Sequence, residues 1–519
     1  MADRPAPYTI AIIGGGVAGP VLALTILSNP VLKERYKPVI YERLARPKPS
    51  AFPDSKSRGE NESTHAPSAA TYAAGAAVAL TSNALYPLYI LGLRDSLDSI
   101  SSETARIKIW RAWDTGKHKY CQQLDNPNWQ EDLGTNLRVV ERAGLQRVVL
   151  DRVQELGGEV IWERKVTDVK SATGGGVKVC FEGGMQVEAN LVVGADGGWS
   201  VVRRHIMATA AAADGGHGAD RWKPEFAYAD GIYGVSKPMD MARSTKCEED
   251  MQDGDTHWVL LDSGTASTWA LPGGRQFWSI SFPSNLPPKR MTAAEHLEKQ
   301  KVDKSYGADL ILGGYDLQET RGILKRHENA FHPTAGNFEE LYKRSERIVR
   351  APLWYHAWEE NEIGGKNIVV IGDASRLMLP TSGQGAGFAI EDATVLANEL
   401  LNNPPSLENG SLDFSRAIEA YAQARVPRSK SMTKQSYWTG QLGLGARWWW
   451  RWLRDFATTY MPLGGDSKAL VYLIIVTNAL RSRLIHRRKT GKKPKDPMGW
   501  LYEVRYKVEL REKQNNLKV

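Results

Sequence analysis

An apolar stretch that runs into three spaced glycines near the start of the chain constrains the fold most. It reads IAIIGGGVAGPVLALTIL, with Gly14, Gly16 and Gly19 between two apolar runs. This order predicts a buried parallel strand over residues 8–13, a tight turn, and a helix over residues 17–28. Gly14 would permit the turn, Gly16 would let the backbone approach a pyrophosphate, and Gly19 would let helix and strand pack closely. A structural glycine turn is the alternative.

A second apolar run and an acidic residue follow the glycines at the spacing of a dinucleotide site. Residues 38–43 read PVIYER and predict a second strand, and Glu42 stands near its end, 23 positions after Gly19. An acid there can accept hydrogen bonds from a ribose diol and disfavours a 2′-phosphate. A surface acid at a strand end is the alternative, and at this point NAD and FAD remain unseparated.

Two later segments repeat the pattern of a buried strand that ends in a carboxylate. ANLVVGADGGWSVVRR contains Asp196, and NIVVIGDASRLMLPTSGQGAGFAIEDATVLANEL contains Asp373. Ligands of open α/β sheets bind at the carboxyl ends of the strands, where both acids would lie. The GQGAG backbone at a predicted helix start would offer N–H groups to a pyrophosphate or to a flavin ring edge. Taken singly, each segment could be a structural Asp–Gly turn.

The three motifs in this order resemble the single-component FAD-dependent aromatic hydroxylases, the class A flavoprotein monooxygenases similar to para-hydroxybenzoate and fungal salicylate hydroxylases. The resemblance covers roughly residues 8–430. VVERAGLQRVVLDRV carries the Arg-x-x-Leu helix start of the family at Arg142, and YAQARVPRSKSM is similar to the helix that follows the third motif. AAGAAVAL resembles the glycine turn that the family places near the isoalloxazine ring.

The resemblance implies which residues contact FAD. They are Gly14, Gly16, Gly19, Glu42, Gly75, Ala76, Arg142, Asp373, Pro380, Gly383, Gly385 and Ala386. Gly75 or Ala76 would sit beside the isoalloxazine ring, and Asp196 would be a structural acid linked to FAD or NAD(P)H. No catalytic side chain is assigned, because in this family the cofactor carries the chemistry while the protein orients the substrate. No metal-ligand pattern is found.

The resemblance also implies the reaction. FAD would be tightly held, and NAD(P)H would be a transient reductant without a Rossmann domain of its own. A flavin C4a-hydroperoxide would then pass one oxygen atom of O2 to an electron-rich ring or alkene. The expected enzyme is thus an oxidoreductase that hydroxylates or epoxidises an apolar aromatic or prenylated small molecule in fungal secondary metabolism. A related oxidase or reductase is the first alternative, and a membrane-surface protein with a vestigial flavin fold is the second.

Two departures from the family pattern concern the substrate. The third motif has Arg376 where the family commonly has His, and this arginine would either bind an anionic group or pair with a neighbouring acid. Phenol-hydroxylating relatives place an Arg near the segment matching residues 226–234, where this chain has Ala229 and Asp230. Phenolate activation is therefore in doubt, which leaves room for epoxidation. The substrate-pocket candidates are Tyr228, Tyr233, Trp258, Trp269 and Arg376.

The expected fold is α/β, with a Rossmann-like FAD-binding domain interleaved with an antiparallel-sheet substrate domain and followed by a helical region. The FAD-binding domain would comprise residues 1–204 and 351–430, with the substrate sheet at 205–350 and a basic helical region at 431–519. Two segments, 45–70 and 205–222, are rich in loop-forming or small residues and predict loops. A length of 519 residues is consistent with two or three domains.

Composition indicates in which compartment the protein works and which kinds of partner it binds. Three widely separated cysteines speak against a disulfide framework and favour a reducing compartment, so cytoplasmic localisation is expected. Much of the net charge of +8 lies in the tail RSRLIHRRKTGKKPK, which is no nucleic-acid module. The apolar run at 469–480 is shorter than the about 20 residues that span a bilayer, so a buried helix is expected there. Peripheral membrane contact through the C-terminal region is left open, and the oligomeric state is not predicted.

Overall fold

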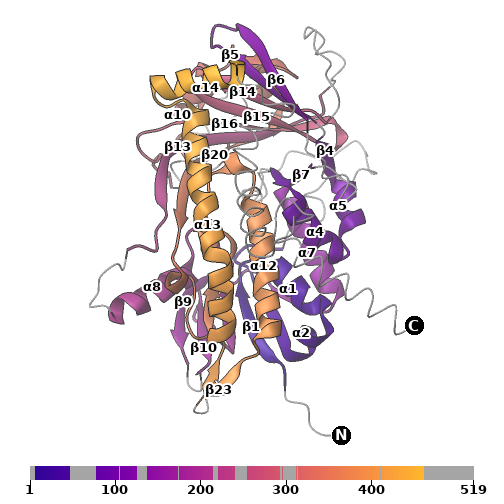
Figure 1. Ribbon diagram of the computed structural model, residues 1–519, viewed down its shortest axis with the longest axis vertical. Helices are drawn as coiled ribbons and strands as arrows, with labels where there is room; N and C mark the ends of the chain where they lie inside the picture. Colours follow the sequence, from indigo (N-terminus) through magenta and orange to yellow (C-terminus); the bar gives the residue numbers. More distant parts are fainter. Residues whose placement is uncertain are drawn as a thin grey trace, which may run out of the picture.

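Two sheets of different kinds lie at opposite ends of the molecule, and two long helices run between them (Figure 1). The computed structural model describes residues 6–46, 77–104, 106–125, 137–172, 175–213, 220–239, 254–292, 295, 311–312, 314–408 and 411–460. Most of the loop predicted over 45–70, from residue 47 onward, lies outside the described residues, as do the apolar run at 469–480 and the basic tail.

The first sheet is parallel and has five strands in the order β21-β12-β1-β2-β8. Its strands are β1 (Tyr8–Ile13), β2 (Tyr36–Tyr41), β8 (Glu159–Ile161), β12 (Leu191–Gly194) and β21 (Ile368–Val370). The register pairs Ile13 with Gly194, and Gly194 with Val370. The three segments that follow these strands therefore emerge at one edge of the sheet, although they are far apart in sequence.

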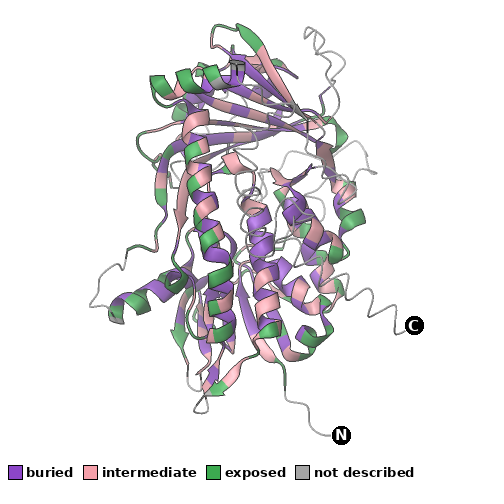
Figure 2. Ribbon diagram, viewed as in Figure 1, coloured by how far each residue is buried: buried purple, intermediate pink, exposed green. Residues whose placement is uncertain are grey.

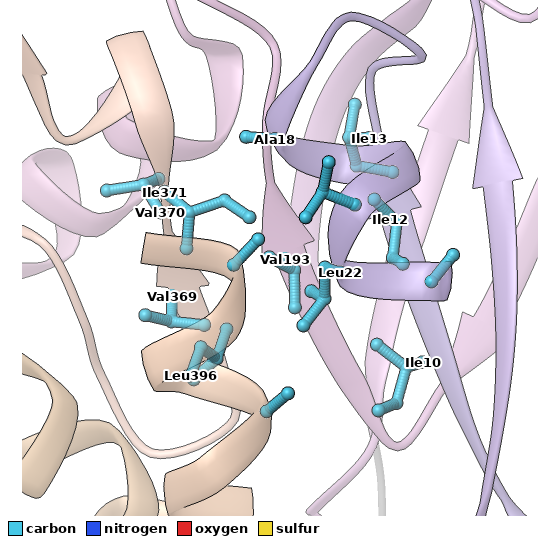
Figure 3. Packing of buried hydrophobic residues seen from close by; sticks show 14 of the residues in the cluster. Ile10, Ile12, Ile13, Ala18, Leu22, Val193, Val369, Val370, Ile371 and Leu396 are labelled. Atoms are coloured by element: carbon cyan, nitrogen blue, oxygen red, sulfur yellow. The ribbon is translucent and has the colours of Figure 1, made fainter. Parts of the chain in front are cut away.

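The core of this unit lies between the parallel sheet and the helices α1 (Ala18–Ser28) and α12 (Gly385–Asn402). Figure 3 shows Leu22 of α1 and Leu396 of α12 beside Val193 of β12 in the parallel sheet, and all three are fully buried. Buried Val and Ile on consecutive positions are typical of parallel strands covered on both faces. A three-stranded sheet joins the same core through its inward valines, and comprises β9 (Val166–Ser171), β10 (Val177–Phe181) and β11 (Gln186–Ala189).

The second sheet is mostly antiparallel and follows the order β17-β20-β13-β16-β15-β14-β5-β6, with β22 paired to β20. Its strands are β5 (Arg106–Ala112), β6 (His118–Asp125), β13 (Glu225–Ser236), β14 (Thr256–Leu261), β15 (Gly264–Leu271), β16 (Arg275–Pro283), β17 (Ile311–Leu312), β20 (Ser345–Ala357) and β22 (Arg376–Leu377). A small sheet of β3 (Ala77–Leu80), β7 (Leu137–Glu141) and β4 (Ser101–Thr104) packs against it.

The remaining elements cover the two sheets or connect them. The helices are α2 (Pro30–Arg35), α4 (Ser82–Ile90), α5 (Arg94–Ile100), α7 (Arg142–Glu155), α8 (Val201–Ala213), α10 (Leu317–Arg326), α11 (Phe338–Lys343), α13 (Ser415–Leu444) and α14 (Trp448–Tyr460). Two hairpins are formed by β18 (Phe331–His332) with β19 (Gly336–Asn337), and by β23 (Ser406–Glu408) with β24 (Ser411–Asp413). No helix in the described ranges combines the length and the apolar character needed to cross a bilayer.

The structure corrects three expectations about how the chain is divided. Strands β5 and β6, which the sequence assigned to the FAD-binding part, belong to the antiparallel sheet, because β5 pairs in parallel with β14. The predicted loop over 205–222 is helical up to Ala213, because alanine is the strongest helix former. Helix α13 also continues through the expected boundary at residue 430. The remaining domain limits stay a proposal.

A buried ion network joins α12 to α13. Glu391 and Asp392 are both fully buried, and Arg425 donates to both carboxylates, at 2.7 Å to Asp392. Arg428 contacts Glu391 through two hydrogen bonds of 2.9 Å, and Arg376 donates to Asp392. The three guanidinium groups also lie over the ring of Phe388, at 4.7 to 5.1 Å from its centre. Because these charges are paired inside the protein, removing one would leave its partners buried without compensation.

The Arg425→Met variant tests this network. It keeps the apolar stem but removes the charge between the two acids, so the free energy of unfolding should fall by about 3–5 kcal/mol. Lys165→Met is the matched control, because Lys165 pairs with Glu182 at 3.0 Å on the exposed surface and should cost less than about 1 kcal/mol. Denaturant unfolding at neutral pH measures both. Equal losses for the two variants would contradict this account.

The network also predicts a loss of stability in acid. Burial would raise the pKa of Glu391 from its ordinary 4.5, but Arg428, Arg425 and hydrogen bonds lower the pKa to about 2. A carboxyl whose pKa is lower in the folded state contributes stability above its unfolded pKa, and this stability is lost as the pH falls through the folded value. The free energy of unfolding should therefore decline between pH 4.5 and about 2. The decline should be smaller in Glu391→Gln, measured across the same pH series.

Candidate active site

The glycine turn after β1 contains two glycines that the fold requires and one that it does not. A Cβ on Gly14, whose φ is +112°, would lie 2.3 Å from the carbonyl oxygen of Ala195, and one on Gly19 would lie 2.2 Å from the carbonyl oxygen of Gly14. A Cβ on Gly16 would approach only the Arg142 guanidinium, at 3.6 Å. No backbone atom of the described residues fills the space beside Gly16. This space would allow a pyrophosphate to approach the Gly16 backbone closely.

Glu42 holds this turn in place. Its side chain is 8% exposed, one carboxylate oxygen accepts a 2.7 Å hydrogen bond from the Gly15 amide, and the other accepts one of 2.9 Å from the Leu44 amide. Each oxygen keeps a further lone pair for a donor such as a ribose hydroxyl. The predicted contact of Glu42 with ribose stays a prediction, and its support of the turn is an additional role.

Helix α7 approaches the same turn with two side chains. Arg142, the first residue of the helix, is exposed beside Gly16, and Gln146 donates a hydrogen bond to the carbonyl oxygen of Gly15. Residues four apart lie on one face of a helix, so both side chains reach the turn together. Sequence reasoning missed Gln146, although its spacing from Arg142 was a usable signal.

Asp373 lies directly after β21, in the 3₁₀ turn η7 (Gly372–Ala374). Its side chain is solvent-exposed, whereas Gly372 and Ala374 are buried. The surrounding protein nonetheless raises the pKa of Asp373, and this rise is opposed by the cations Arg142, Arg376 and Arg203. Asp373 lies at the same edge of the parallel sheet as the glycine turn, and its carboxylate is accessible to solvent. It can therefore accept hydrogen bonds from the hydroxyl groups of a ligand.

Asp196 caps a helix. One of its carboxylate oxygens accepts hydrogen bonds from the amides of Val201, at 2.7 Å, and Val202, at 3.3 Å, at the start of α8. The other oxygen is buried and has no hydrogen-bond partner within the described part of the chain. Burial raises the pKa of this carboxyl. The cap is a structural role, while the predicted link of Asp196 to FAD or NAD(P)H stays a prediction.

Arg203 ties the second motif to the third. Its guanidinium donates to the carbonyl oxygens of Gly198 and Ala374 and stacks on Trp358 at 3.6 Å. Burial lowers the pKa of Arg203 to about 10, so the group stays charged at neutral pH. Arg203 thereby connects the backbone that follows β12 to the turn that carries Asp373.

The predicted contacts from the third motif lie around the start of α12. The 3₁₀ turn η8 (Pro380–Ser382) leads to Gly383, whose φ is +62°, and α12 begins at Gly385 followed by Ala386. No side chain within the described ranges caps the first turn of α12, so its amide groups remain available to an anion. A Cβ on Gly383 would lie 4.0 Å from Ala79 of β3. The predicted ring contacts Gly75 and Ala76 lie outside the described residues.

A row of side chains crosses four strands of the antiparallel sheet on one face. The register places Tyr233 opposite Ser279, Ser279 opposite Ser267, and Ser267 opposite Trp258. The two serine hydroxyls lie 2.8 Å apart, and Trp269 donates to Ser267 at 3.1 Å. Directly opposed residues share a face, so these side chains form one surface, here called the serine–aromatic row. Sequence reasoning missed both serines, because nothing in the pattern separates them from other strand serines.

One part of the serine–aromatic row packs against the small sheet, whereas Trp258 packs in a separate cluster with Ile109 and Leu260. Tyr233 and Trp269 pack with Ala79 of β3 and Val139 of β7 in one apolar cluster. Burial raises the pKa of Tyr233, and the charge of Arg142 opposes this rise. Arg142 thus lies beside the glycine turn, and its charge acts on both Asp373 and Tyr233.

Two predicted substrate residues lie elsewhere. Tyr228 is 61% exposed with a φ of +53°, in an irregular part of β13 where it contacts Phe226. Arg376 is 1% exposed and donates to Asp392. Pairing with a neighbouring acid, the second alternative given for Arg376, describes its position in the structure.

Curated proteins similar to this chain are FAD-dependent monooxygenases and hydroxylases. The chain is 27% identical to the FAD-dependent monooxygenase pynG of Aspergillus niger over 424 residues, which cover 78% of this chain and 88% of that protein. It is 24% identical to the salicylate hydroxylase of Pseudomonas putida over 449 residues, covering 85% and 87%. The chain is thus similar to FAD-dependent monooxygenases over most of its length. These similarities indicate that the protein is an enzyme, an oxidoreductase and a flavoprotein. No protein-family model matches the chain.

Solved structures of FAD-dependent hydroxylases share the fold of this monooxygenase. Klebsiella pneumoniae HpxO, complexed with FAD and uric acid, aligns with a TM-score of 0.60 at 17% identity, over 86% of this chain and 93% of that one. The 2,6-dihydroxypyridine-3-hydroxylase of Arthrobacter nicotinovorans aligns with a TM-score of 0.58 at 17% identity, over 86% and 95%. At this identity the likeness concerns the fold, a parallel sheet interleaved with a larger antiparallel sheet.

Two glycine variants separate binding of FAD from folding. Gly16→Ala adds a methyl group where the protein has room, so the variant should fold normally but retain FAD about tenfold or more weakly. Gly14→Ala forces a clash with Ala195 at positive φ and should lower the free energy of unfolding by about 2 kcal/mol or more. Flavin absorbance after gel filtration and denaturant unfolding measure the two effects. A Gly16→Ala protein that retains FAD as the parent does would contradict the assignment.

Proposed function

We propose that this monooxygenase uses NAD(P)H and O2 to insert one oxygen atom into an apolar aromatic or prenylated small molecule of secondary metabolism. The observation that carries the proposal is the placement of the three motifs. The glycine turn and Asp373 emerge at one edge of the parallel sheet, and Arg142 links that edge to the serine–aromatic row. A cofactor site and a substrate surface would then adjoin each other.

The described residues would contact several parts of FAD. The backbone at Gly16 and the start of α12 would hold the pyrophosphate or the flavin ring edge with N–H groups, and Glu42 would accept from the ribose. Asp373 would accept from a ribityl hydroxyl, while Arg142 would offset the negative charge of the phosphates. Bound FAD supplies the redox chemistry, taking electrons from the nicotinamide and activating O2.

The serine–aromatic row would orient the substrate. None of its members, Tyr233, Ser279, Ser267 and Trp258, carries a charge at neutral pH, which favours a neutral and largely apolar substrate. The two serine hydroxyls would hydrogen-bond one polar group of the substrate while the aromatic rings pack against its carbon skeleton and exclude water. Asp230, where phenol-hydroxylating relatives place an Arg, is buried and paired with Arg350 at 2.8 Å. It offers no cation to a phenolate, which leaves epoxidation beside hydroxylation.

A labelled-oxygen experiment tests the proposed reaction. The purified protein, reconstituted with FAD, should oxidise NADPH or NADH faster when a substrate from a panel of apolar aromatic and prenylated compounds is present. The product should carry one labelled atom when isotopically labelled O2 is used, as read by mass spectrometry. A product that has lost hydrogen without gaining oxygen would instead identify an oxidase or a reductase of the same fold. Failure to take up FAD would overturn the proposal.

A further inference from the structure

Helix α14 is attached to the antiparallel sheet by its charged side. Arg454 is 2% exposed and donates to the carbonyl oxygens of Leu261, at 2.9 Å, and Gly264, at 3.1 Å. Asp455 accepts a 3.1 Å hydrogen bond from Arg111 of β5. The guanidinium of Arg454 thus holds the helix to the turn between β14 and β15.

The apolar residues of α14 point away from this attachment. Trp448, Trp449, Trp452, Leu453 and Phe456 are 79%, 39%, 63%, 39% and 43% exposed. Their spacing places them on one side of the helix, which is called here the tryptophan face. Figure 2 shows exposed residues along α14, at the end of the molecule formed by the antiparallel sheet. An amphipathic helix of a globular domain normally buries its apolar side, so α14 has the reverse orientation.

The chemistry around the tryptophan face favours a lipid surface over other occupants. Tryptophan is enriched where membranes meet water, because its ring is apolar and its N–H is polar. Arg447, beside the first tryptophan of the helix, is exposed. The sequence after the helix contains the short apolar run at 469–480 and then eight Lys or Arg residues between 481 and 495. Basic segments bind anionic lipids, and the same positive charge would oppose the association of two copies of this chain.

We propose that the tryptophan face of α14 docks this protein onto the surface of an anionic lipid bilayer. The helix would lie in the interface with its apolar side among the acyl chains and its arginine-anchored side toward the protein. Docking through α14 would bring strands β14 and β15, which carry Trp258 and Ser267, close to the bilayer. If the proposed function holds, an apolar substrate dissolved in the membrane would then reach the serine–aromatic row by a short path.

A vesicle-binding experiment with the full chain tests the docking. The parent protein should co-sediment with vesicles of phosphatidylcholine and phosphatidylserine, and less with phosphatidylcholine alone. The double variant Trp448→Glu with Trp452→Glu should bind the anionic vesicles about tenfold more weakly. The matched control is Leu286→Glu with Leu407→Glu, because these leucines are 76% and 72% exposed at other sites. The control should bind as the parent does.

Each other outcome overturns the proposal in a recognisable way. A parent protein that stays in the supernatant, or a tryptophan variant that binds as well as the parent, would exclude docking through this face. A parent dimer that the tryptophan variant dissociates would identify a second copy as the occupant. A marked fall in the melting temperature of the variant without vesicles would identify the chain's own C-terminal residues as the cover. FAD content and NAD(P)H oxidation without vesicles should be equal in parent and variant. A failure of the proposed function can therefore be distinguished from a failure of membrane docking.

Discussion

The buried carboxylate of Asp392 supports most of the candidate site. Besides pairing with Arg425 and Arg376, it accepts a 2.9 Å hydrogen bond from the Gly372 amide, in the turn that carries Asp373. Its neighbour Glu391 accepts from Asn83 of α4, so the same acidic pair also holds the helix that follows β3. Desolvated charges tolerate little displacement, because each depends on its partners for compensation. The strand end and the start of α12 are thereby fixed relative to each other before any ligand binds.

Sequence reasoning identified the parallel unit well, because its signals are local. Each signal predicts the structure of the residues directly beside it. These signals are the β-branched run before Gly14, the acid at Glu42 and the strand that ends before Asp373. Contacts that depend on distant pairing could not be found in this way. The parallel pairing of β5 with β14, and the alignment of Ser267 with Ser279, follow from the register of the whole sheet. Arg376 left two interpretations, which only its burial beside Asp392 distinguishes.

The two sheets offer a ligand contrasting electrostatic surroundings. At the edge of the parallel sheet, Arg142, Arg203 and Arg376 act on the carboxyl of Asp373, an arrangement that suits a ligand with phosphates. The serine–aromatic row presents hydroxyl groups and rings with no formal charge. A charged cofactor would therefore bind at the edge of the parallel sheet, and a neutral substrate would bind at the serine–aromatic row. The charge of Arg142 acts on Tyr233, which belongs to the row.

The order of strands in the parallel sheet has a consequence for biosynthesis. The central strand β1 is made first, but β21 follows only at Ile368–Val370, and the charge of Glu391 gains its arginine partners only when Arg425 and Arg428 have been made. A nascent chain therefore carries an incomplete sheet edge and, for a time, a glutamate without its arginine partners. Such long-range closure slows folding and leaves unpaired strand edges open to aggregation. Chaperone assistance during synthesis should accordingly affect the yield of this protein more than that of a protein whose sheet closes locally.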